Sequence, residues 1–346
     1  MSSARAVRPT HVLVRCAPMA VTRDAGPALL DDAEQYRREL RAYCYRMLGS
    51  SFEAEDAVQE TMVRAWKKAD TFEGRAALRS WLYRIATNVC LDMLRGRQRR
   101  AVAMDLGPSR KADDFQHATR PNETWIEPVP DAAVVPLDGD PADVAAARDS
   151  IRLAFVTALQ HLPARQRAVL ILREVLRWQA TEVAELLDTS VASVNSALQR
   201  ARATLAERGT TEDGVRASTT SSMAPADQEL LARYVDAFER YDIDLLVTLL
   251  HEDAVMSMPP FDFWLQGASD VAQFFVGPGI GCKGSRLVPT SANGQPAFGS
   301  YKADPSGGWA PWAIQVLDVV DGRIAGHHNF LDMSLFELFG LPAHLS

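Results

Sequence analysis

Residues 54–100 read AEDAVQETMVRAWKKADTFEGRAALRSWLYRIATNVCLDMLRGRQRR and predict two amphipathic helices of opposite charge. The first, over residues 53–68, has an apolar stripe that ends in Trp66 and a polar face opposite to it. That polar face consists of Glu55, Asp56, Gln59 and Glu60. The second helix, over residues 77–95, exposes Arg79, Arg84, Asn88 and Arg95. An acidic face beside a basic face indicates two different partners, the second of them a polyanion.

The composition is that of a globular protein with two or three folded units. The chain has 346 residues, 47% of them hydrophobic, and a formal net charge of −7. Basic residues crowd 64–100 and 165–208, so a nucleic-acid-binding surface is compatible with the acidic total. No apolar run is as long as a membrane span. The 4 cysteines form no Cys-x-x-Cys pair, which favours free thiols in a reducing cytoplasm. Nothing in the sequence indicates a metal or a cofactor.

Three stretches with little helical pattern divide the chain. Residues 1–26 predict a disordered extension or an over-extended start, with Met19 as the alternative start. Residues 101–143 are rich in proline and aspartate, and they predict either a flexible linker or an extended acidic segment. Residues 209–226 are rich in Thr, Ser, Gly and Ala and predict a flexible linker. The remaining units are a helical bundle over 27–100, a second helical unit over 144–208 and a mixed unit over 227–346.

The second helical unit predicts a helix-turn-helix. A helix over 180–187, a turn at 188–190 and a helix over 191–206 have the spacing of that motif, and Ser190 suits the N-cap of the second helix. The outward face of this second helix carries Ser193, Asn195, Ser196, Gln199, Arg200 and Arg202. Such side chains reach base edges in the major groove, while arginines hold phosphates. A plain three-helix packing motif has the same shape, so both interpretations stand at this point.

The mixed unit predicts an α+β domain, because helices are followed by a run of antiparallel strands. Its expected strands cover residues 254–258, 286–292, 295–302, 311–320 and 323–329. Asp321-Gly322 between the last two predicts a hairpin turn.

Two parts of the chain resemble a known family. The pieces AEDAVQET (54–61), RAW (64–66), Phe72 and WLYRIATN (81–88) resemble region two of extracytoplasmic function sigma factors, the small sigma-70-type subunits of bacterial RNA polymerase. The pieces LPARQR (162–167) and SALQRAR (196–202) resemble region four of the same family.

Region four departs from the family pattern at three positions. Ala192 stands where the family has glycine, Asn195 where it has a basic residue, and Gln179 where it has serine. The fold should survive these changes. The base preference of other members does not transfer, because Asn favours adenine edges where Arg favours guanine.

The last third of the chain resembles the SnoaL-like branch of the NTF2-like cone fold. The pieces that carry this resemblance are YVDAF (234–238), HEDAV (251–255), MPP (258–260), Trp264, Gly267, NGQPA (293–297), DGRI (321–324) and FLD (330–332). The resemblances together imply a multidomain fold: two all-α sigma domains, a helical bundle and a helix-turn-helix, followed by an α+β NTF2-like cone domain.

The sigma-factor resemblance implies a transcription initiation factor, not an enzyme, that binds core RNA polymerase and promoter DNA. Core polymerase would dock on Glu55, Asp56, Gln59 and Glu60. The melted minus-ten strand would be bound by Arg75, Arg79, Arg84, Asn88 and Arg95, with Trp81 and Tyr83 as candidates for base stacking. For Trp81, packing in the helix core is the favoured alternative. The minus-thirty-five duplex would be bound by Ser193, Asn195, Ser196, Gln199, Arg200 and Arg202. Segment 101–143 would thread the channels of the polymerase, where its acidic side chains imitate a phosphate chain.

The cone domain offers three interpretations. Relatives of this fold include isomerases, cyclases and hydrolases, and the candidate pocket residues here are Asp253, Trp264, Trp312, His328 and Asp332. Catalysis is the weakest interpretation and ligand sensing the second. A regulatory contact with the sigma domains is the strongest. Two alternatives for the whole chain remain: a stand-alone helix-turn-helix regulator with a ligand-sensing cone domain, and a SnoaL-type enzyme with a DNA-binding appendage. The stand-alone regulator leaves the acidic face of residues 55–60 unexplained.

Overall fold

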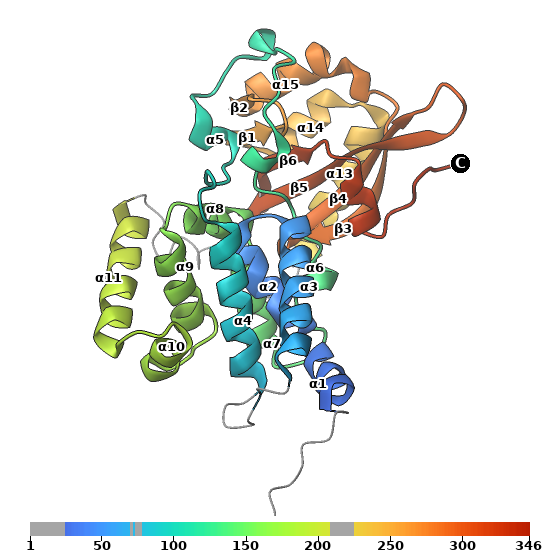
Figure 1. The fold of residues 1–346 in the computed structure, drawn as a ribbon. Coiled ribbons are helices and arrows are strands. Elements are labelled where there is room, and N and C mark those ends of the chain that lie inside the picture. The colour runs from blue at the N-terminus through green and yellow to red at the C-terminus, as the bar shows by residue number, and fades with distance from the viewer. Residues whose placement is uncertain (1–24, 70–71, 73–77, 208–224) are drawn as a thin grey trace, which may run out of the picture.

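The computed structural model describes residues 25–69, 72, 78–207 and 225–346, which form a helical half and a sheet half (Figure 1). The predicted disordered extension and the predicted linker 209–226 lie outside these ranges, apart from the last two residues of each. Among the described residues, no helix is both long and apolar enough to cross a membrane.

The first part of the helical half is a bundle of the predicted kind. Its helices are α1 (Ala25–Glu34), α2 (Arg37–Leu48), α3 (Ser51–Lys67) and α4 (Leu78–Met93). Gly49 ends α2 with a φ of 72°, and the Ser50 hydroxyl accepts a 3.2 Å hydrogen bond from the Glu53 backbone N–H at the start of α3. The apolar stripes meet inside the bundle, where Tyr43, Val58 and Leu82 are fully buried.

The second part of the helical half contains the predicted helix-turn-helix. Its elements are α8 (Leu153–Gln160), α9 (Ala164–Leu170), the π-helical turn η4 (Ile171–Val175), α10 (Ala180–Leu186) and α11 (Val191–Glu207). Asp188 adopts a φ of 50° in the turn, a conformation that Asp tolerates. The Ser190 hydroxyl accepts a 3.1 Å hydrogen bond from the Ser193 backbone N–H, as the N-cap prediction requires.

Segment 101–149 is bound to both halves. It contains α5 (Ala103–Leu106), η2 (Ala112–Asp114), η3 (Asn122–Thr124), α6 (Asp131–Val134) and α7 (Pro141–Asp149). The Phe115 ring packs against Phe261, Phe263 and Phe274 of the sheet half, with ring centroids 5.3, 5.0 and 5.6 Å away. Near its other end, Arg38 of α2 donates a 3.0 Å hydrogen bond to the Val135 carbonyl. The expectation of a flexible linker is therefore wrong for this arrangement of the chain.

The sheet half is an α+β domain, as predicted. Its elements are α13 (Pro225–Arg240), α14 (Ile243–Leu249), β1 (Leu250–Ser257), β2 (Trp264–Gln266), α15 (Ala268–Val276), η5 (Pro278–Cys282), β3 (Arg286–Ala292), β4 (Gln295–Ala303), β5 (Trp309–Val320), β6 (Arg323–Phe330) and α16 (Ser334–Leu338). The six strands have the order β2-β1-β6-β5-β4-β3, with only the β1–β6 pair parallel. Sequence periodicity missed β2, because three residues are too few to show alternation.

The interior of the sheet half is filled by side chains. The Tyr234 hydroxyl donates a 2.8 Å hydrogen bond to the Gln315 side chain and lies 2.7 Å from Nε2 of His327. These three residues are at most 3% exposed. Burial lowers the pKa of His327 to about 3, so the ring is neutral at physiological pH. The rings of Phe238, Phe275 and Phe298 pack around this group.

The turn between β3 and β4, residues 293–294, joins the two halves. The Asn293 side chain has no exposed surface. Its Nδ2 donates to the Tyr45 hydroxyl at 2.7 Å and to the Ile151 carbonyl at 2.6 Å, and its Oδ1 accepts from the Val129 backbone N–H at 3.0 Å. Asn293 and Gly294 adopt φ of 57° and 71°, which suits the tight turn of a two-residue hairpin. The 293–294 turn therefore contacts α2, segment 101–149 and Ile151, two residues before α8.

We predict that Phe115→Ala releases segment 101–149 from the sheet half. The free energy of unfolding should fall by about 2 kcal/mol, less than the ~3–5 kcal/mol of a fully buried Phe, because Phe115 is only partly buried. Trypsin should then cleave faster at the exposed Arg110, Lys111 and Arg120. Leu137→Ala is the control, because Leu137 is 75% exposed and lies in the same part of the chain. Equal cleavage rates in the two variants would contradict the assignment.

Candidate functional site

The predicted polar face of α3 is present and has an apolar extension. Asp56 and Gln59 are exposed. Glu55 is within 2.5 Å of Arg41, and Glu60 is 2.7 Å from Arg64. The prediction that Trp66 is buried on the apolar stripe is wrong: Trp66 is 57% exposed, and Val63 one turn earlier is 42% exposed.

These two apolar side chains are functional candidates that periodicity missed. An exposed Trp on a helix is uncommon in a monomer surface and typical of an interface. The helical spacing of Gln59, Val63 and Trp66 puts them on the same side of α3. The α3 surface, defined as Asp56, Gln59, Glu60, Val63 and Trp66, therefore combines acidic and apolar side chains.

The predicted basic face of α4 is partly covered. Arg79 bonds Glu39 at 2.9 Å, and its guanidinium lies 5.3 Å from the Tyr83 ring and 5.5 Å from the Trp178 ring. Arg84 lies 3.5 Å from the Glu185 carboxylate of α10. Arg75 lies outside the described residues.

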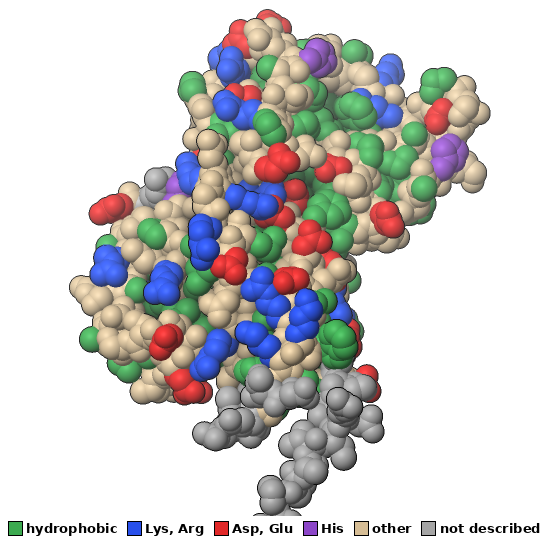
Figure 2. Space-filling view, viewed as in Figure 1, with side chains coloured by type: hydrophobic (Ala, Val, Ile, Leu, Met, Phe, Trp, Pro, Cys, Tyr) green, Lys and Arg blue, Asp and Glu red, His purple; other side chains and the backbone are tan. Residues whose placement is uncertain are grey.

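The other end of the α4 face is open. Asn88 and Arg95 are exposed, and Arg95 is 3.0 Å from Asp92. Lys and Arg side chains gather over the helical half in Figure 2, with acidic side chains among them. The four described residues therefore do not share one helix face: Arg79 and Asn88 are nine residues apart and lie on opposite sides of α4, and Arg95 follows the end of the helix.

The Trp178 side chain packs on α4 and covers part of its surface. The Trp178 and Tyr83 rings are 5.1 Å apart, and the two residues are 6% and 0% exposed. Tyr83 therefore cannot stack on a base in this arrangement, contrary to expectation. Its hydroxyl is buried without a partner, and burial raises the pKa of that hydroxyl. The helix-turn-helix part thus packs on the face of α4 predicted to bind DNA.

The predicted face of α11 is open. All six residues are exposed: Ser193, Asn195, Ser196, Gln199, Arg200 and Arg202. Arg202 pairs with Glu174 at 2.5 Å, which fixes its direction. The other five lie along one side of the helix and are exposed. The structure brings these residues together as predicted.

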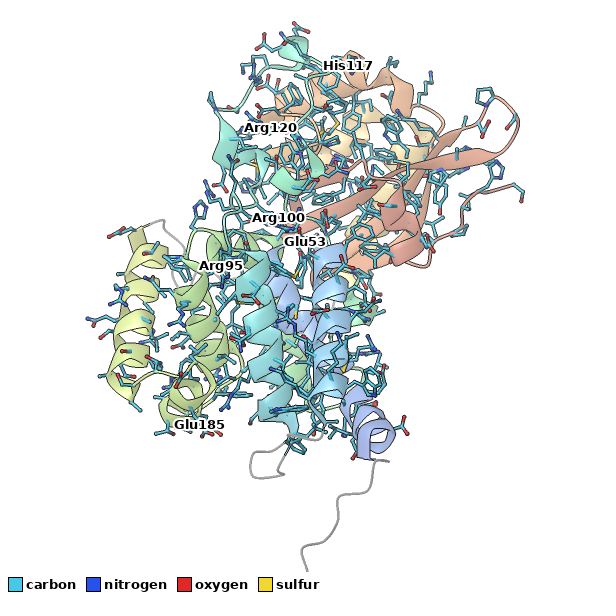
Figure 3. The ribbon with its side chains drawn as sticks, viewed as in Figure 1. Glu53, Arg95, Arg100, His117, Arg120 and Glu185 are labelled. Carbon is cyan, nitrogen blue, oxygen red and sulfur yellow. The ribbon has the colours of Figure 1, made fainter. Side chains whose placement is uncertain are left out.

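Segment 101–149 places a carboxylate against the basic end of α4. Arg100 is 7% exposed, and it lies 3.0 Å from Glu53 and 3.4 Å from Glu127. Arg100 also donates a 2.6 Å hydrogen bond to the Trp125 carbonyl. Figure 3 shows Glu53 and Arg100 side by side where the two halves meet. Arg100 is therefore held inside the protein and is unavailable to a nucleic acid in this arrangement.

The five predicted cone-pocket residues have different surroundings in the sheet half. Asp253 is exposed on β1, and the Trp264 indole donates to the Gly107 carbonyl at 2.9 Å. The Lys302 ammonium lies 3.2 Å from the Trp312 ring centroid. His328 lies between Ser257 and Asp318, at 2.9 and 3.1 Å, and Asp332 accepts a hydrogen bond from the Ser334 backbone N–H at the start of α16.

One buried polar group of the cone is His327 with Tyr234 and Gln315. His327 is, like His328, a candidate acid or base from its residue type, whereas Tyr234 and Gln315 are not among the residues selected from the sequence. Among the described residues, no cluster of three His, Cys, Asp or Glu side chains could hold a metal ion.

Comparisons with known proteins agree with this domain order. Residues 33–100 match the Sigma-70 region 2 family, residues 152–205 match Sigma-70, region 4, and residues 231–327 match the SnoaL-like domain family. The ECF RNA polymerase sigma factor SigG of Mycobacterium tuberculosis (strain H37Rv) is 45% identical over 314 residues, which cover 90% of this chain and 83% of SigG.

Two further relatives extend the comparison. The ECF RNA polymerase sigma factor SigJ of the same organism is 28% identical over 85% of this chain and 89% of its own. SigW of Bacillus subtilis is 29% identical over 51% of this chain and 87% of its own.

The solved structure of M. tuberculosis SigJ superposes with a TM-score of 0.57 at 23% identity, and it covers 91% of this chain and 99% of its own. That likeness shows a common fold across both halves. The three matched families follow one another along the chain in the same order as the helical bundle, the helix-turn-helix and the cone domain. The similarity to SigG covers 90% of this chain. The chain therefore belongs to the extracytoplasmic function (ECF) family of RNA polymerase sigma factors.

Proposed function

We propose that this chain is a cytoplasmic initiation factor that directs RNA polymerase to a specific set of promoters and catalyses no reaction itself. The observation that carries this proposal is the presence of three different surfaces on one helical half. These are the acidic and apolar α3 surface, the basic face of α4, and the polar face of the second helix of a helix-turn-helix.

The α3 surface is proposed to bind core RNA polymerase. Trp66 and Val63 supply apolar area that is exposed in the free chain, and Asp56 and Glu60 supply acidic charge. Interfaces of this kind bury a few aromatic anchors inside a polar rim. The acidic rim favours a basic partner surface and disfavours DNA.

Promoter DNA is proposed to bind at α11 and α4. The exposed polar residues near the start of α11 suit base edges in a major groove, and Arg200 suits a phosphate. Arg79, Arg84, Asn88 and Arg95 suit the backbone of a melted strand. Because Trp178 and Glu185 cover part of α4, the helix-turn-helix part must move away from α4 before the whole strand-binding face is free.

The SnoaL-like domain is proposed to restrain that movement. Asn293 bonds simultaneously to α2, to segment 101–149 and to the Ile151 carbonyl before α8. Moving α8 relative to α2 would leave buried polar groups of Asn293 without partners, at a cost of about 1–3 kcal/mol for each group. The domain therefore favours the arrangement in which α4 is covered.

We predict that Trp66→Ala weakens binding to core polymerase about tenfold, because a central aromatic side chain supplies a large part of the binding free energy of an interface. The affinity of the labelled full chain for purified core polymerase measures this effect. Val320→Ala, which removes a 40% exposed apolar side chain from the sheet half, should leave the affinity unchanged. If the Trp66 variant bound core polymerase with unaltered affinity, the α3 surface would not be the docking surface.

We predict that Arg200→Ala weakens binding of the full chain to duplex promoter DNA about tenfold. The slope of log K against log salt concentration should fall by about 0.9, because one phosphate contact is lost. Arg233→Ala is the control, since Arg233 is exposed on α13, far from α11 in sequence. A changed slope in the control, or none in the Arg200 variant, would count against the assignment.

We predict that Gly294→Ala raises the yield of run-off transcripts from limiting amounts of the chain. A Cβ at Gly294 would lie 2.8 Å from the Arg148 carbonyl oxygen, so the 293–294 turn must withdraw from α7. Gly322→Ala is a matched control: it imposes the same strain at a φ of 70°, but its Cβ meets nothing within 4 Å. A lower yield from Gly294→Ala than from Gly322→Ala would make the SnoaL-like domain a required activator.

A further inference from the structure

The exposed face of α11 divides into side chains that are bonded within the protein and side chains that are free. The Ser193 hydroxyl lies 3.1 Å from the Ser190 hydroxyl. Arg202 pairs with Glu174 at 2.5 Å. Within the described part of the chain, four side chains of this face make no side-chain hydrogen bond or ion pair: Asn195, Ser196, Gln199 and Arg200. The capacity of the face to bind a new partner therefore lies in two amides, one hydroxyl and one guanidinium.

The two free amides, Asn195 and Gln199, lie side by side. They are four positions apart in α11, which places them on the same side of the helix, about 6 Å apart along its axis. Together with Leu198 and Arg202 they line a shallow hollow of about 230 Å³. The ion pair of Arg202 with Glu174 holds one wall of this hollow in place. Both amides are exposed, and Figure 1 shows α11 at the outer edge of the helical half.

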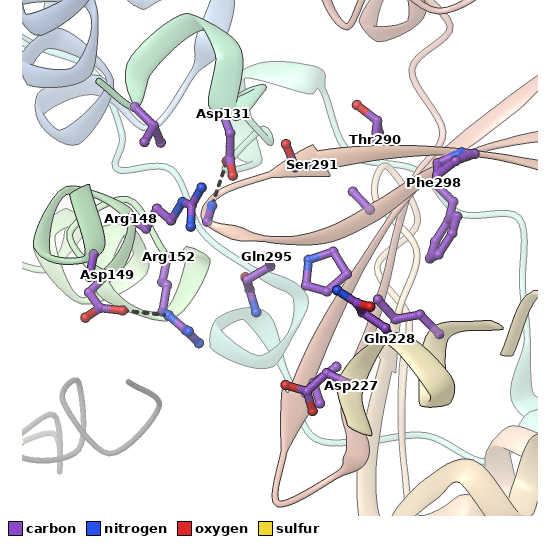
Figure 4. Close-up of a pocket in the computed structure, with 18 of the residues that line it drawn as sticks. Asp131, Arg148, Asp149, Arg152, Asp227, Gln228, Thr290, Ser291, Gln295 and Phe298 are labelled. Carbon is purple, nitrogen blue, oxygen red and sulfur yellow. Dashed lines mark hydrogen bonds and ion pairs between the residues drawn. The ribbon is translucent and has the colours of Figure 1, made fainter. Parts of the chain in front are cut away.

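A larger hollow, between α7 and the sheet half, has polar side chains that are already bonded. Arg152 lies 3.3 Å from Asp149 there, as a dashed line in Figure 4 shows. A second dashed line joins Asp131 to the Gly294 backbone N–H at 2.7 Å. The two α11 amides differ from these groups, because no described residue occupies their donors and acceptors.

A carboxamide presents one donor beside one acceptor, and that pattern selects one base. In the major groove, adenine offers its N6 donor beside its N7 acceptor, so an Asn or Gln side chain can form two hydrogen bonds with it. Guanine offers two acceptors there, which leave the amide oxygen without a donor and suit an arginine instead. Two neighbouring amides therefore favour two adenines. A separation of about 6 Å corresponds to roughly two base-pair steps of ~3.4 Å, so at most one base pair lies between these adenines.

We propose that Asn195 and Gln199 each bind the N6 and N7 atoms of one adenine in the major groove. The element that α11 reads then contains two A·T pairs, with at most one base pair between them. Asn195 stands where the family has a basic residue, so this preference is a property of this chain. The proposal rests on the proposed function of α11 as the helix that binds duplex DNA.

The first test selects duplexes from a random pool with the full chain and then changes single atoms of the selected element. Replacing either adenine by 7-deazaadenine removes N7 but keeps N6 and the base pairing, so the affinity should fall about fivefold at each position. In Asn195→Ala one of the two replacements should have no further effect, and in Gln199→Ala the other should have none, because the bond to N7 is already absent. The same replacement in an A·T pair that flanks the element is the control.

The second test changes the preferred base. Asn195→Arg should change the preference at one position from A·T to G·C by about tenfold, and Gln199→Arg should do so at the other position. Ala206→Arg is the control for added charge, because Ala206 is exposed on α11 but lies about 16 Å along the helix from Asn195. It should raise the affinity for all sequences alike. All three substituted positions are exposed, so the unfolding temperature should stay the same.

Three results would overturn the proposal. They are an element without two A·T pairs in this spacing, a preference for A·T that survives both arginine substitutions, and equal losses from 7-deazaadenine in the unaltered chain and in both alanine variants. Failure of the proposed function has a different outcome: no element would be selected from the pool, and Arg200→Ala would leave duplex binding unchanged. If Arg200→Ala weakens binding while the amide variants keep the original preference, α11 binds DNA without reading adenine.

Discussion

The side-chain amide of Asn293 is fully buried, and its three hydrogen bonds end on three parts of the chain that are far apart in sequence. A buried amide of this kind is stable only when every partner stays in place, because water cannot replace a lost bond. The position of the β3–β4 hairpin, the course of segment 101–149 and the placement of α8 against α2 are therefore coupled through one side chain.

Two buried arginines couple the parts of the helical half in the same way. Arg46 of α2 donates to the Ser150 carbonyl at 3.1 Å and to its hydroxyl at 2.6 Å. Arg167 of α9 donates to the Met47 carbonyl and, at 2.6 Å, to the Gln160 side chain. Burial lowers the pKa of each guanidinium to about 10, and both remain charged at neutral pH. Separating the bundle from the helix-turn-helix part would leave these buried charges without their hydrogen-bond partners unless water replaces them.

The two faces that we propose to bind DNA consequently differ in access. The α11 face is free, whereas Arg79 lies against the Trp178 ring and Arg84 faces Glu185 on α10. Arg79 and its partner Glu39 are partly exposed, and so is the Arg84–Glu185 pair, so these contacts contribute little by themselves. The buried contact of Trp178 with Tyr83 is the more important one. An open α11 face beside a partly covered α4 agrees with our proposal that full activity requires a rearrangement of the helical half.

The sequence by itself determined the local structures and the surfaces carried on single elements. Helical periodicity found α3, α4 and α11, and turn chemistry found the Asp321-Gly322 hairpin and the Ser190 cap, because these depend on residues only a few positions apart. Only the tertiary structure decided which of those surfaces are free. The exposure of Trp66, the burial of Tyr83 and the bound course of segment 101–149 depend on partners tens to hundreds of residues away.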